Sequence, residues 1–346
     1  MRFGLSLILF SYFSTMIYGE LISIMVGTSI AVGLGSFLFY NQCKVLECCE
    51  APWIKIRYKE LSEALRKRLY GQHIAIAAVE NLVSGHLKQV KEGKSKKSLV
   101  MSFHGWPGIG KTYTSTIIAE HLFEKGFSSK YVKRYYGSKD FPLPNRVNEY
   151  RENIQRWIAG NLSDCTKTLF IFDEVDKMSP KILDAISPFG QENVRISGKP
   201  ANDAIFIFIS NAGGDAIANK VREFYLKKGF REDLKLEDFE NIIKEVAVNK
   251  GGLEESDMIF RGIVDVFVPF LPLEKKHIEE CIETIFNERE YTNVEYNKKI
   301  KDFLLKQITF SPKNDPLFSV NGCRLIEHKM NLVSEKYYKK PEIDEI

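Results

Sequence analysis

The chain has 346 residues, of which 44% are hydrophobic and 27% are charged, and its formal net charge is +4. These values exclude a disordered or fibrous chain and leave room for one large or two medium domains. The 49 basic and 45 acidic residues are spread along the sequence rather than gathered in a basic stripe. We therefore expect no nucleic-acid partner.

Two apolar segments come first in the chain. Residues 1–19 contain a basic residue, an apolar run and a closing glycine, the order typical of a signal peptide. The next stretch has about the 20 residues that a membrane span needs. Three arrangements fit: a cleaved signal followed by an embedded segment, one long signal anchor, or a signal plus a helix that dips into one leaflet. Because glycine, serine and threonine make the second stretch only moderately hydrophobic, we expect residues 20–40 to associate with the membrane without crossing it.

The cysteine content agrees with entry into the secretory pathway. Six cysteines, an even number behind a signal sequence, permit disulfides. Cys48 and Cys49 could be disulfide partners or ordinary free thiols, and the sequence leaves both open. Asn161 begins an Asn-Leu-Ser triplet, which makes it a candidate glycosylation site in a lumenal or secreted protein.

After residue 50, helical and strand patterns alternate. This order predicts an α/β fold with a parallel sheet and helices on both faces. The spacing of apolar residues predicts helices at 54–69, 74–90 and 112–123 and buried strands at 99–103, 168–172 and 204–210.

The glycine-rich segment after the first strand matches the phosphate-binding loop pattern G-x-x-x-x-G-K-[ST]. Glycines let backbone N–H groups turn toward phosphate oxygens, and the following helix aims its positive N-terminal dipole at the same anion. Lys111 is expected to reach the β and γ phosphates of ATP, and the Thr112 hydroxyl to ligate Mg²⁺. The residues that we expect to bind the nucleotide are Gly105, Trp106, Pro107, Gly108, Ile109, Gly110, Lys111 and Thr112, together with Asp173.

Two further strands end on polar residues suited to ATP hydrolysis. The strand at 168–172 runs into Asp173 and Glu174, the pattern of a Walker B segment. Asp173 is expected to hold Mg²⁺, and Glu174 to orient and deprotonate the attacking water. Asn211 follows the next strand, where its amide could position that water against the γ phosphate. A turn asparagine ahead of two glycines is the alternative.

These three strands resemble the core of an AAA+ ATPase, and the detailed sequence resembles the torsin family within that class. The resemblance covers nearly the whole chain. The segments that carry it are the double apolar N-terminus, Cys48-Cys49, Tyr70-Gly71-Gln72-His73, residues 170–178, Ser210-Asn211-Ala212-Gly213, residues 268–274 and Gly322-Cys323-Arg324.

The resemblance implies a lumenal ATPase of the endoplasmic reticulum and nuclear envelope that remodels protein or membrane assemblies. It implies a nucleotide-binding domain at 51–270 and a smaller helical lid at 271–346. The Gly322-Cys323-Arg324 segment corresponds to a sensor motif that places a cation, here Arg324, toward the γ phosphate. By the same resemblance Cys281 pairs with Cys323. That disulfide could make the nucleotide site sensitive to redox state, or it could have only the structural role of stabilising the lid.

The torsin resemblance also implies a chain that lacks its own arginine finger, and we expect a homo- or hetero-oligomer. The lumenal domain of a type II membrane protein then supplies one, and an arginine given in trans can raise phosphoryl transfer by roughly 10³ to 10⁵. Arg261 is the candidate for a finger in cis, although we expect it to be structural or interfacial. The chain departs from the usual torsin loop, Gly-x-Thr-Gly-x-Gly-Lys-Asn, by having Pro107 and Thr112.

Two classes of function stay open. One is a partner-activated ATPase that remodels assemblies, as Clp-type proteins do. The other is an interaction or self-assembly module that ATP regulates and that hydrolyses little by itself. An aromatic residue in the pore would favour an unfoldase that threads its substrate. In the segment around Lys139, Phe141 is the only candidate for such a residue.

Overall fold

The computed structural model describes residues 43, 45–314 and 316–337. It divides into a unit that ends at Glu50 and a large unit that begins at Ala51. In the first unit, Cys43 forms a disulfide with Cys48. The expected signal peptide and membrane-associating segment, residues 1–19 and 20–40, lie outside the described residues, so both stay predictions. Among the helices that are described, none is long and apolar enough to cross a bilayer.

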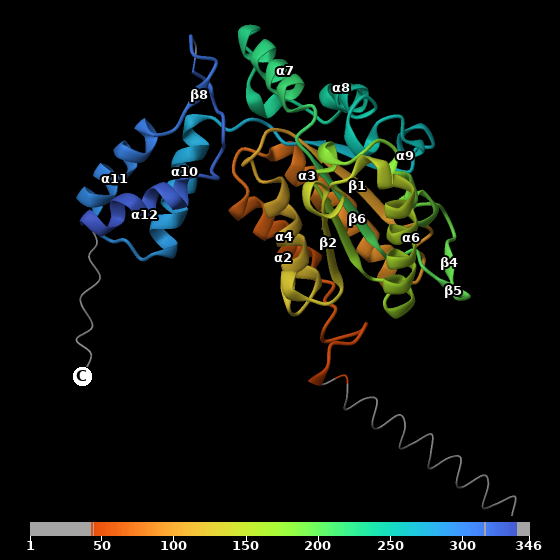
Figure 1. The fold of residues 1–346 in the computed structure, drawn as a ribbon. Coiled ribbons are helices and arrows are strands. Elements are labelled where there is room, and N and C mark those ends of the chain that lie inside the picture. Colours follow the sequence, from red (N-terminus) through yellow and green to blue (C-terminus); the bar gives the residue numbers. More distant parts are fainter. Residues whose placement is uncertain (1–42, 44, 315, 338–346) are drawn as a thin grey trace, which may run out of the picture. The chain divides into compact units, whose positions relative to one another are not determined.

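A five-stranded parallel sheet forms the centre of the large unit (Figure 1). Its strand order is β2-β3-β6-β1-β7, and every neighbouring pair is parallel. The strands are β1 (Leu99–His104), β2 (Val132–Tyr136), β3 (Leu169–Asp173), β6 (Ile205–Ser210) and β7 (Val266–Pro269). Every residue of β1, β3 and β6 is buried, which explains why the three predicted strands are continuous apolar runs.

Helices cover both faces of this sheet. Helix α4 contacts α2, β3 and β6, and α3 contacts β1 and β7. The other face carries the large core, in which Phe170, Phe172, Phe206 and Phe208 pack with apolar residues of α6, α7 and α8. Figure 1 shows α2 and α4 to one side of the strands and α6 to the other. The helices are α2 (Tyr58–Arg68), α3 (His73–Lys91), α4 (Lys111–Leu122), α5 (Gly137–Asp140), α6 (Val147–Asp164), α7 (Gly214–Leu226), α8 (Glu237–Ala247) and α9 (Asp257–Phe260).

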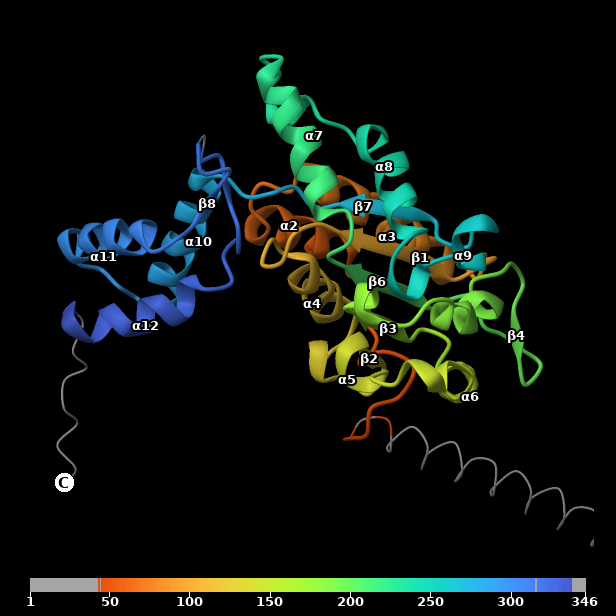
Figure 2. The same ribbon diagram turned by 45° about the horizontal axis from the view of Figure 1, so that its top comes forward.

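The C-terminal part of the unit is mainly helical. Contacts join α11 to both α10 and α12, and α10 to α12 (Figure 2). Its elements are α10 (Lys275–Glu288), α11 (Val294–Lys306), α12 (Ile326–Tyr337), β8 (Phe310–Ser311) and β9 (Phe318–Ser319). A further short hairpin, β4 (Arg195–Ile196) with β5 (Lys199–Pro200), lies outside the main sheet.

The first helix begins later than its sequence pattern predicts. We expected helix from residue 54, but α2 begins at Tyr58. Ile54 instead forms a β-bridge with Phe123, and Lys55 N donates to Leu122 O at 2.7 Å. Residues 54–57 therefore precede the helix, and the first two of them pair with the end of α4.

Candidate functional site

The phosphate loop joins the end of β1 to the start of α4. Gly105, Gly108 and Gly110 have φ angles of 147°, 76° and 107°, a region that side chains with a Cβ rarely occupy. A Cβ at Gly105 would lie 2.5 Å from Phe270 O, and one at Gly108 would collide with Asn321 O. The glycines of the sequence motif are thus required by backbone conformation and by close neighbours. The loop leads straight into the N-terminus of α4, which favours an anion at this place.

Lys111 is a buried cation turned back onto the loop. Its Nζ donates to Gly105 O and Trp106 O, both at 2.6 Å, and to Asn211 Oδ1 at 3.0 Å. Burial lowers the lysine pKa from 10.5 to about 8, although Asp173 and Asp176 oppose this shift. Two of the three acceptors are carbonyls of the loop itself, so phosphate oxygens would be stronger partners for the ammonium group.

Thr112 and the two acids of the Walker B segment meet at this edge of the sheet. Thr112 Oγ1 donates to Asp173 Oδ2 at 3.1 Å, which brings together the two oxygens expected to hold Mg²⁺. Asp173 Oδ1 accepts from Glu174 N at 2.9 Å. Glu174 has a left-handed backbone with φ of 57°, and its Oε2 accepts a hydrogen bond from Ser138 Oγ. Ser138 therefore holds the carboxylate that we expect to act on water.

Arg134 is a site residue that the sequence did not indicate. It lies in β2, and its Nη2 forms a hydrogen-bonded ion pair with Asp173 Oδ2. In the register of the parallel pair, Tyr136 lies opposite Asp173, so the Arg134 side chain comes from two residues earlier on the neighbouring strand. The only sequence signal was a charge within a short aromatic strand, and nothing local showed that this strand pairs with β3.

Asn211 is brought to the phosphate loop as expected. Its Oδ1 accepts from Lys111, and its backbone N donates to Asp176 Oδ1 at 2.9 Å. Asp176 is buried and fixes the turn that presents Asn211. Asp176 lies within the torsin-like residues 170–178, and the sequence predicted no role for it. Asn211 therefore lies beside the phosphate loop in an ordered turn, and its role toward the γ phosphate stays a prediction.

The predicted sensor segment of the lid touches the tip of the phosphate loop. Cys323 N donates to Gly108 O at 3.0 Å, and a Cβ added at Gly108 would lie 3.0 Å from Arg324 Cβ. Gly322 has a φ of 52°, and a Cβ there would collide with Gly108 O. Arg324 is exposed beside the loop, where a cation could meet the terminal phosphate. The segment and the loop are in backbone contact.

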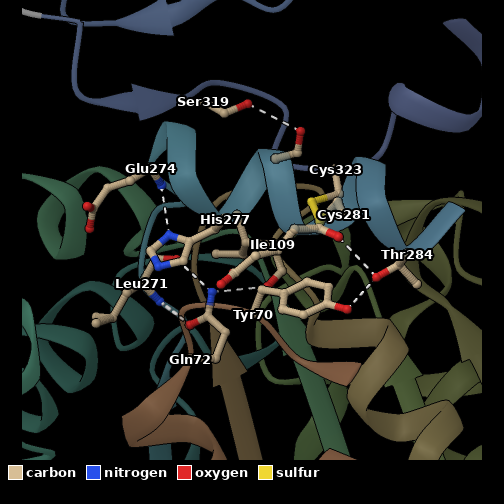
Figure 3. The surroundings of a disulfide bond; sticks show 12 residues. Tyr70, Gln72, Ile109, Leu271, Glu274, His277, Cys281, Thr284, Ser319 and Cys323 are labelled. Carbon is tan, nitrogen blue, oxygen red and sulfur yellow. Dashed lines mark hydrogen bonds between the residues drawn. A yellow bond between two sulfur atoms is a disulfide. The ribbon is translucent and has the colours of Figure 1, made fainter. Parts of the chain in front are cut away.

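The Cys281–Cys323 disulfide is present, with a Cα–Cα distance of 6.2 Å. It ties α10 to the sensor segment (Figure 3). Cys323 therefore carries both the disulfide and the hydrogen bond to Gly108. No cysteine among the described residues is a free thiol, which decides the question left open for Cys48 and Cys49.

Gln72 connects the loop to the start of the lid and was not assigned a role from the sequence. Its amide exchanges two hydrogen bonds with the backbone of Leu271, at 2.7 and 2.8 Å, and donates a longer one to Ile109 O at 3.2 Å (Figure 3). Gln72 is 1% exposed. The phosphate loop and the segment after β7 are thus held by one buried side chain.

The residues at this edge fit a magnesium nucleotide. A hydroxyl and a carboxylate oxygen are hard ligands suited to Mg²⁺. The positive φ angles of the loop glycines let backbone N–H groups turn toward an anion. Thr112 and Asp173 would hold the ion, and Lys111 and the N-terminus of α4 would hold the phosphates.

Comparison with known proteins agrees with this geometry. The torsin family model matches residues 43–172, and the model described as "Torsin-1A, C-terminal domain" matches residues 273–333. A torsin-like protein of Drosophila melanogaster is 36% identical over 309 residues, which cover 88% of this chain and 90% of that protein. The chain belongs to the torsin family. A torsin-like protein of Caenorhabditis elegans is 34% identical over 327 residues, covering 92% of this chain and 91% of that one.

The solved structures similar to this torsin-family chain show its AAA+ fold. A closed-state reconstruction of Hsp104 with ATPγS and FITC casein has a TM-score of 0.55 at 19% identity, and covers 81% of this chain and 46% of the Hsp104 chain. The S. cerevisiae Hsp104-ADP complex has a TM-score of 0.53 at 20% identity with the same coverage. The chain thus spans about half the length of Hsp104. At this identity the likeness shows the fold alone.

Three further predicted residues of this torsin-family chain make contacts outside the phosphate site. Trp106 Nε1 donates to Asp215 Oδ1 at 2.8 Å, so its indole is directed to α7. Arg261 follows α9 and pairs with Asp257 at 3.1 Å, both side chains being more than half exposed. Asn161 lies in α6 and its Nδ2 donates to Trp157 O at 2.7 Å. Its glycosylation stays a prediction.

Phe141 cannot serve as an exposed pore aromatic in this structure. It is 6% exposed. Its ring contacts those of Tyr135 and Tyr150, with centroid distances of 5.2 and 5.3 Å. The residue belongs to the hydrophobic core, and the weak sequence support for a threading mechanism is removed.

Proposed function

We propose that this torsin-family protein binds ATP with Mg²⁺ and hydrolyses it. The observation that carries the proposal is the meeting of Thr112, Asp173 and Lys111 at one edge of the sheet. Thr112 Oγ1 and Asp173 Oδ2 are 3.1 Å apart, and Lys111 Nζ lies among loop carbonyls where phosphate oxygens would replace them. This arrangement supports the binding of a metal nucleotide rather than of a small organic ligand.

Different side chains would stabilise the phosphates and activate the attacking water. Lys111 and Arg324 would neutralise phosphate oxygens, and bound Mg²⁺ would supply further positive charge to those oxygens. Glu174 would orient the attacking water and accept its proton, after exchanging its hydrogen bond with Ser138 for one with water. Asn211, fixed by Asp176, would hold that water in line.

We further propose that the protein acts in the lumen of the endoplasmic reticulum and nuclear envelope. The signal-like residues 1–19, the apolar residues 20–40 and the disulfides support this location. There it would remodel protein or membrane assemblies as a homo- or hetero-oligomer associated with the membrane. The lumenal domain of a type II membrane protein would act as its activator by adding an arginine in trans.

One observation favours low hydrolysis by the isolated chain. Both acids of the Walker B segment are engaged, Asp173 by Arg134 and Glu174 by Ser138. The alternative is therefore a module whose interactions or self-assembly are regulated by ATP, with little intrinsic hydrolysis. The two proposals share the nucleotide site and differ in whether turnover is needed.

ATP turnover by the purified full-length protein tests the first proposal. We expect negligible turnover alone and a rise of at least 10³-fold when the lumenal domain of a type II membrane partner is added. Fast turnover without a partner would contradict activation in trans and would make Arg261→Ala the next variant to measure. Failure to bind labelled ATP under any condition would overturn the nucleotide proposal itself.

Glu174→Gln separates the remodeller from the regulated module. The amide keeps the shape of the side chain but cannot accept a proton, so turnover should fall by at least 10²-fold while ATP binding remains. A remodeller should then stay bound to its partner and lose function in cells. Full function with the Glu174→Gln protein would favour the regulated module. Glu152→Gln, on the exposed side of α6, is the matched control, because it makes the same change away from the site.

A further inference from the structure

Arg134 places a fixed positive charge where the metal ion of an ATPase is expected. Its Nη2 pairs with Asp173 Oδ2, the same oxygen that accepts from Thr112 Oγ1. Asp173 Oδ1 is already used by Glu174 N at 2.9 Å. The carboxylate thus has both oxygens engaged and a cation in contact with the one that faces Thr112.

The arginine is held in this position by aromatic rings. Its guanidinium carbon lies 4.1 Å from the ring centroid of Tyr136 and 5.5 Å from that of Phe127. The side chains of Arg134 and Asp173 are 19% and 11% exposed, so water screens their attraction only partly. Such a pair persists in solution where an exposed pair would not.

The guanidinium is nevertheless only partly satisfied. Arg134 Nε is buried and has no hydrogen-bond partner among the described residues. A buried donor without an acceptor is unfavourable, because the group has lost its hydrogen bonds to water. Arg134 thus keeps one buried donor that no acceptor among the described residues uses.

We propose that Arg134 is an internal counter-ion of Asp173 that competes with Mg²⁺ and so regulates how strongly nucleotide binding depends on the metal. This inference rests on the proposed ATP site. Without metal, Arg134 neutralises Asp173 and lowers the repulsion between that carboxylate and the phosphates. With metal, the ion must share or displace the guanidinium, so part of the affinity that Mg²⁺ would add is lost. Arg134 is a positioning residue and touches no reacting atom.

The test is the ratio of two dissociation constants of a fluorescent ATP analogue, measured with full-length protein in EDTA and in excess Mg²⁺. For Arg134→Leu we expect weaker binding in EDTA and stronger binding with Mg²⁺. The dissociation constant in EDTA divided by that in Mg²⁺ should therefore be at least about tenfold larger than for the unaltered protein. Lys133→Leu is the matched control, because it removes the neighbouring cation from β2 while its side chain points to the other face. Its ratio should not change.

The possible outcomes separate this inference from the function on which it rests. An unchanged or smaller ratio for Arg134→Leu, with normal nucleotide binding, overturns the role of Arg134 and leaves the ATP site standing. No nucleotide binding by the unaltered protein in either buffer overturns both. Arg134→Gln, which keeps polar donors without the charge, should show the same rise in ratio and is the second variant should the leucine protein fail to fold. Mn²⁺ binding without nucleotide, followed by electron paramagnetic resonance, should also tighten in both Arg134 variants and not in Lys133→Leu.

Discussion

Buried charged and polar groups serve two regions of this molecule in different ways. The phosphate corner, made of Lys111, Thr112, Asp173 and Arg134, consists of charges that pair with one another or with the loop's own carbonyls. The hinge cluster contains Arg231 and Glu274, together with Tyr70, Gln72 and His277, and joins the nucleotide-binding part to the first helix of the lid.

The two regions differ in what their buried polar groups bind. In the phosphate corner the proposed nucleotide and its metal would replace the present contacts. In the hinge cluster, Arg231 donates to Gly71 O at 2.7 Å and to Glu274 Oε1 at 2.9 Å, and Glu274 also accepts from Tyr225 at 2.6 Å. These contacts hold the structure itself. Variants in the first region should therefore change binding, and variants in the second should change stability.

The largest loss of stability is expected for Arg231→Met. Arg231 is 3% exposed, and its loss leaves Glu274 as a poorly paired carboxylate and Gly71 O without its donor. Breaking a buried pair from one side costs about 3 to 5 kcal/mol. Thermal unfolding should show a fall in Tm on the order of 10 °C.

Lys111→Met is the matched control for that prediction. It also replaces a buried cation by an apolar chain of similar length, but in the phosphate corner. Burial lowers the pKa of Lys111 to about 8, so the folded state does not favour its charged form. We therefore expect no fall in the free energy of unfolding, while nucleotide binding is lost. Equal losses of stability in both variants would refute the comparison between the two regions.

The second prediction concerns pH and the hinge cluster. Burial, with Arg231 next in importance, lowers the pKa of His277 from 6.5 to about 4, although Glu274 and Glu232 oppose the shift and Lys276 adds to it. The ring lies on Gly71, where a Cβ would be 2.8 Å away, and its Nδ1 accepts from Glu274 N. His277 is therefore protonated near pH 6.5 in the unfolded chain, but only near pH 4 in the folded chain.

The stability due to neutral His277 is present above pH 6.5 and is lost as the pH falls toward 4, by up to about 3 kcal/mol. Urea unfolding at a series of pH values between 7 and 4.5 measures this loss. Replacing the ring in His277→Gln should remove most of the difference, because glutamine does not titrate. If the variant loses stability with pH as steeply as the unaltered protein, His277 is not the group responsible.

The phosphate corner could be predicted from the sequence only in part. Gly105 to Thr112 and the pair Asp173 and Glu174 are contiguous motifs, and the parallel sheet brings strand ends to one edge whatever the strand order. Arg134 and Ser138 were not predicted as site residues, because they belong to β2 and the residues just after it. Which strand lies beside β3 is decided by packing between distant segments, and a charge within Val132–Tyr136 says nothing of its partner.

The hinge cluster was even less visible in the sequence. Tyr70-Gly71-Gln72-His73 was noted as a motif that the chain shares with torsins, yet the partners of Gln72 lie 37 and 199 positions away. The Cys281–Cys323 pairing came from the family resemblance and was confirmed. Arg231 lies in a polar region and Glu274 ends the torsin-like residues 268–274, and only the folded chain shows that the two side chains meet.

The smallest expected effect is that of Tyr70→Phe, which tests one contact between the two parts that the hinge cluster joins. The Tyr70 hydroxyl shares a hydrogen bond with Thr284 Oγ1 on α10, three residues after Cys281 (Figure 3). Its removal should lower the free energy of unfolding by about 1 kcal/mol and Tm by about 2 to 4 °C. Thr284→Val removes the other partner but also the bond from Thr284 to Glu280 O at 3.0 Å. The double variant should therefore lose less stability than the sum of the single losses. Additive losses would show that the two hydroxyls are independent, and that the link between Tyr70 and α10 contributes nothing to the hinge.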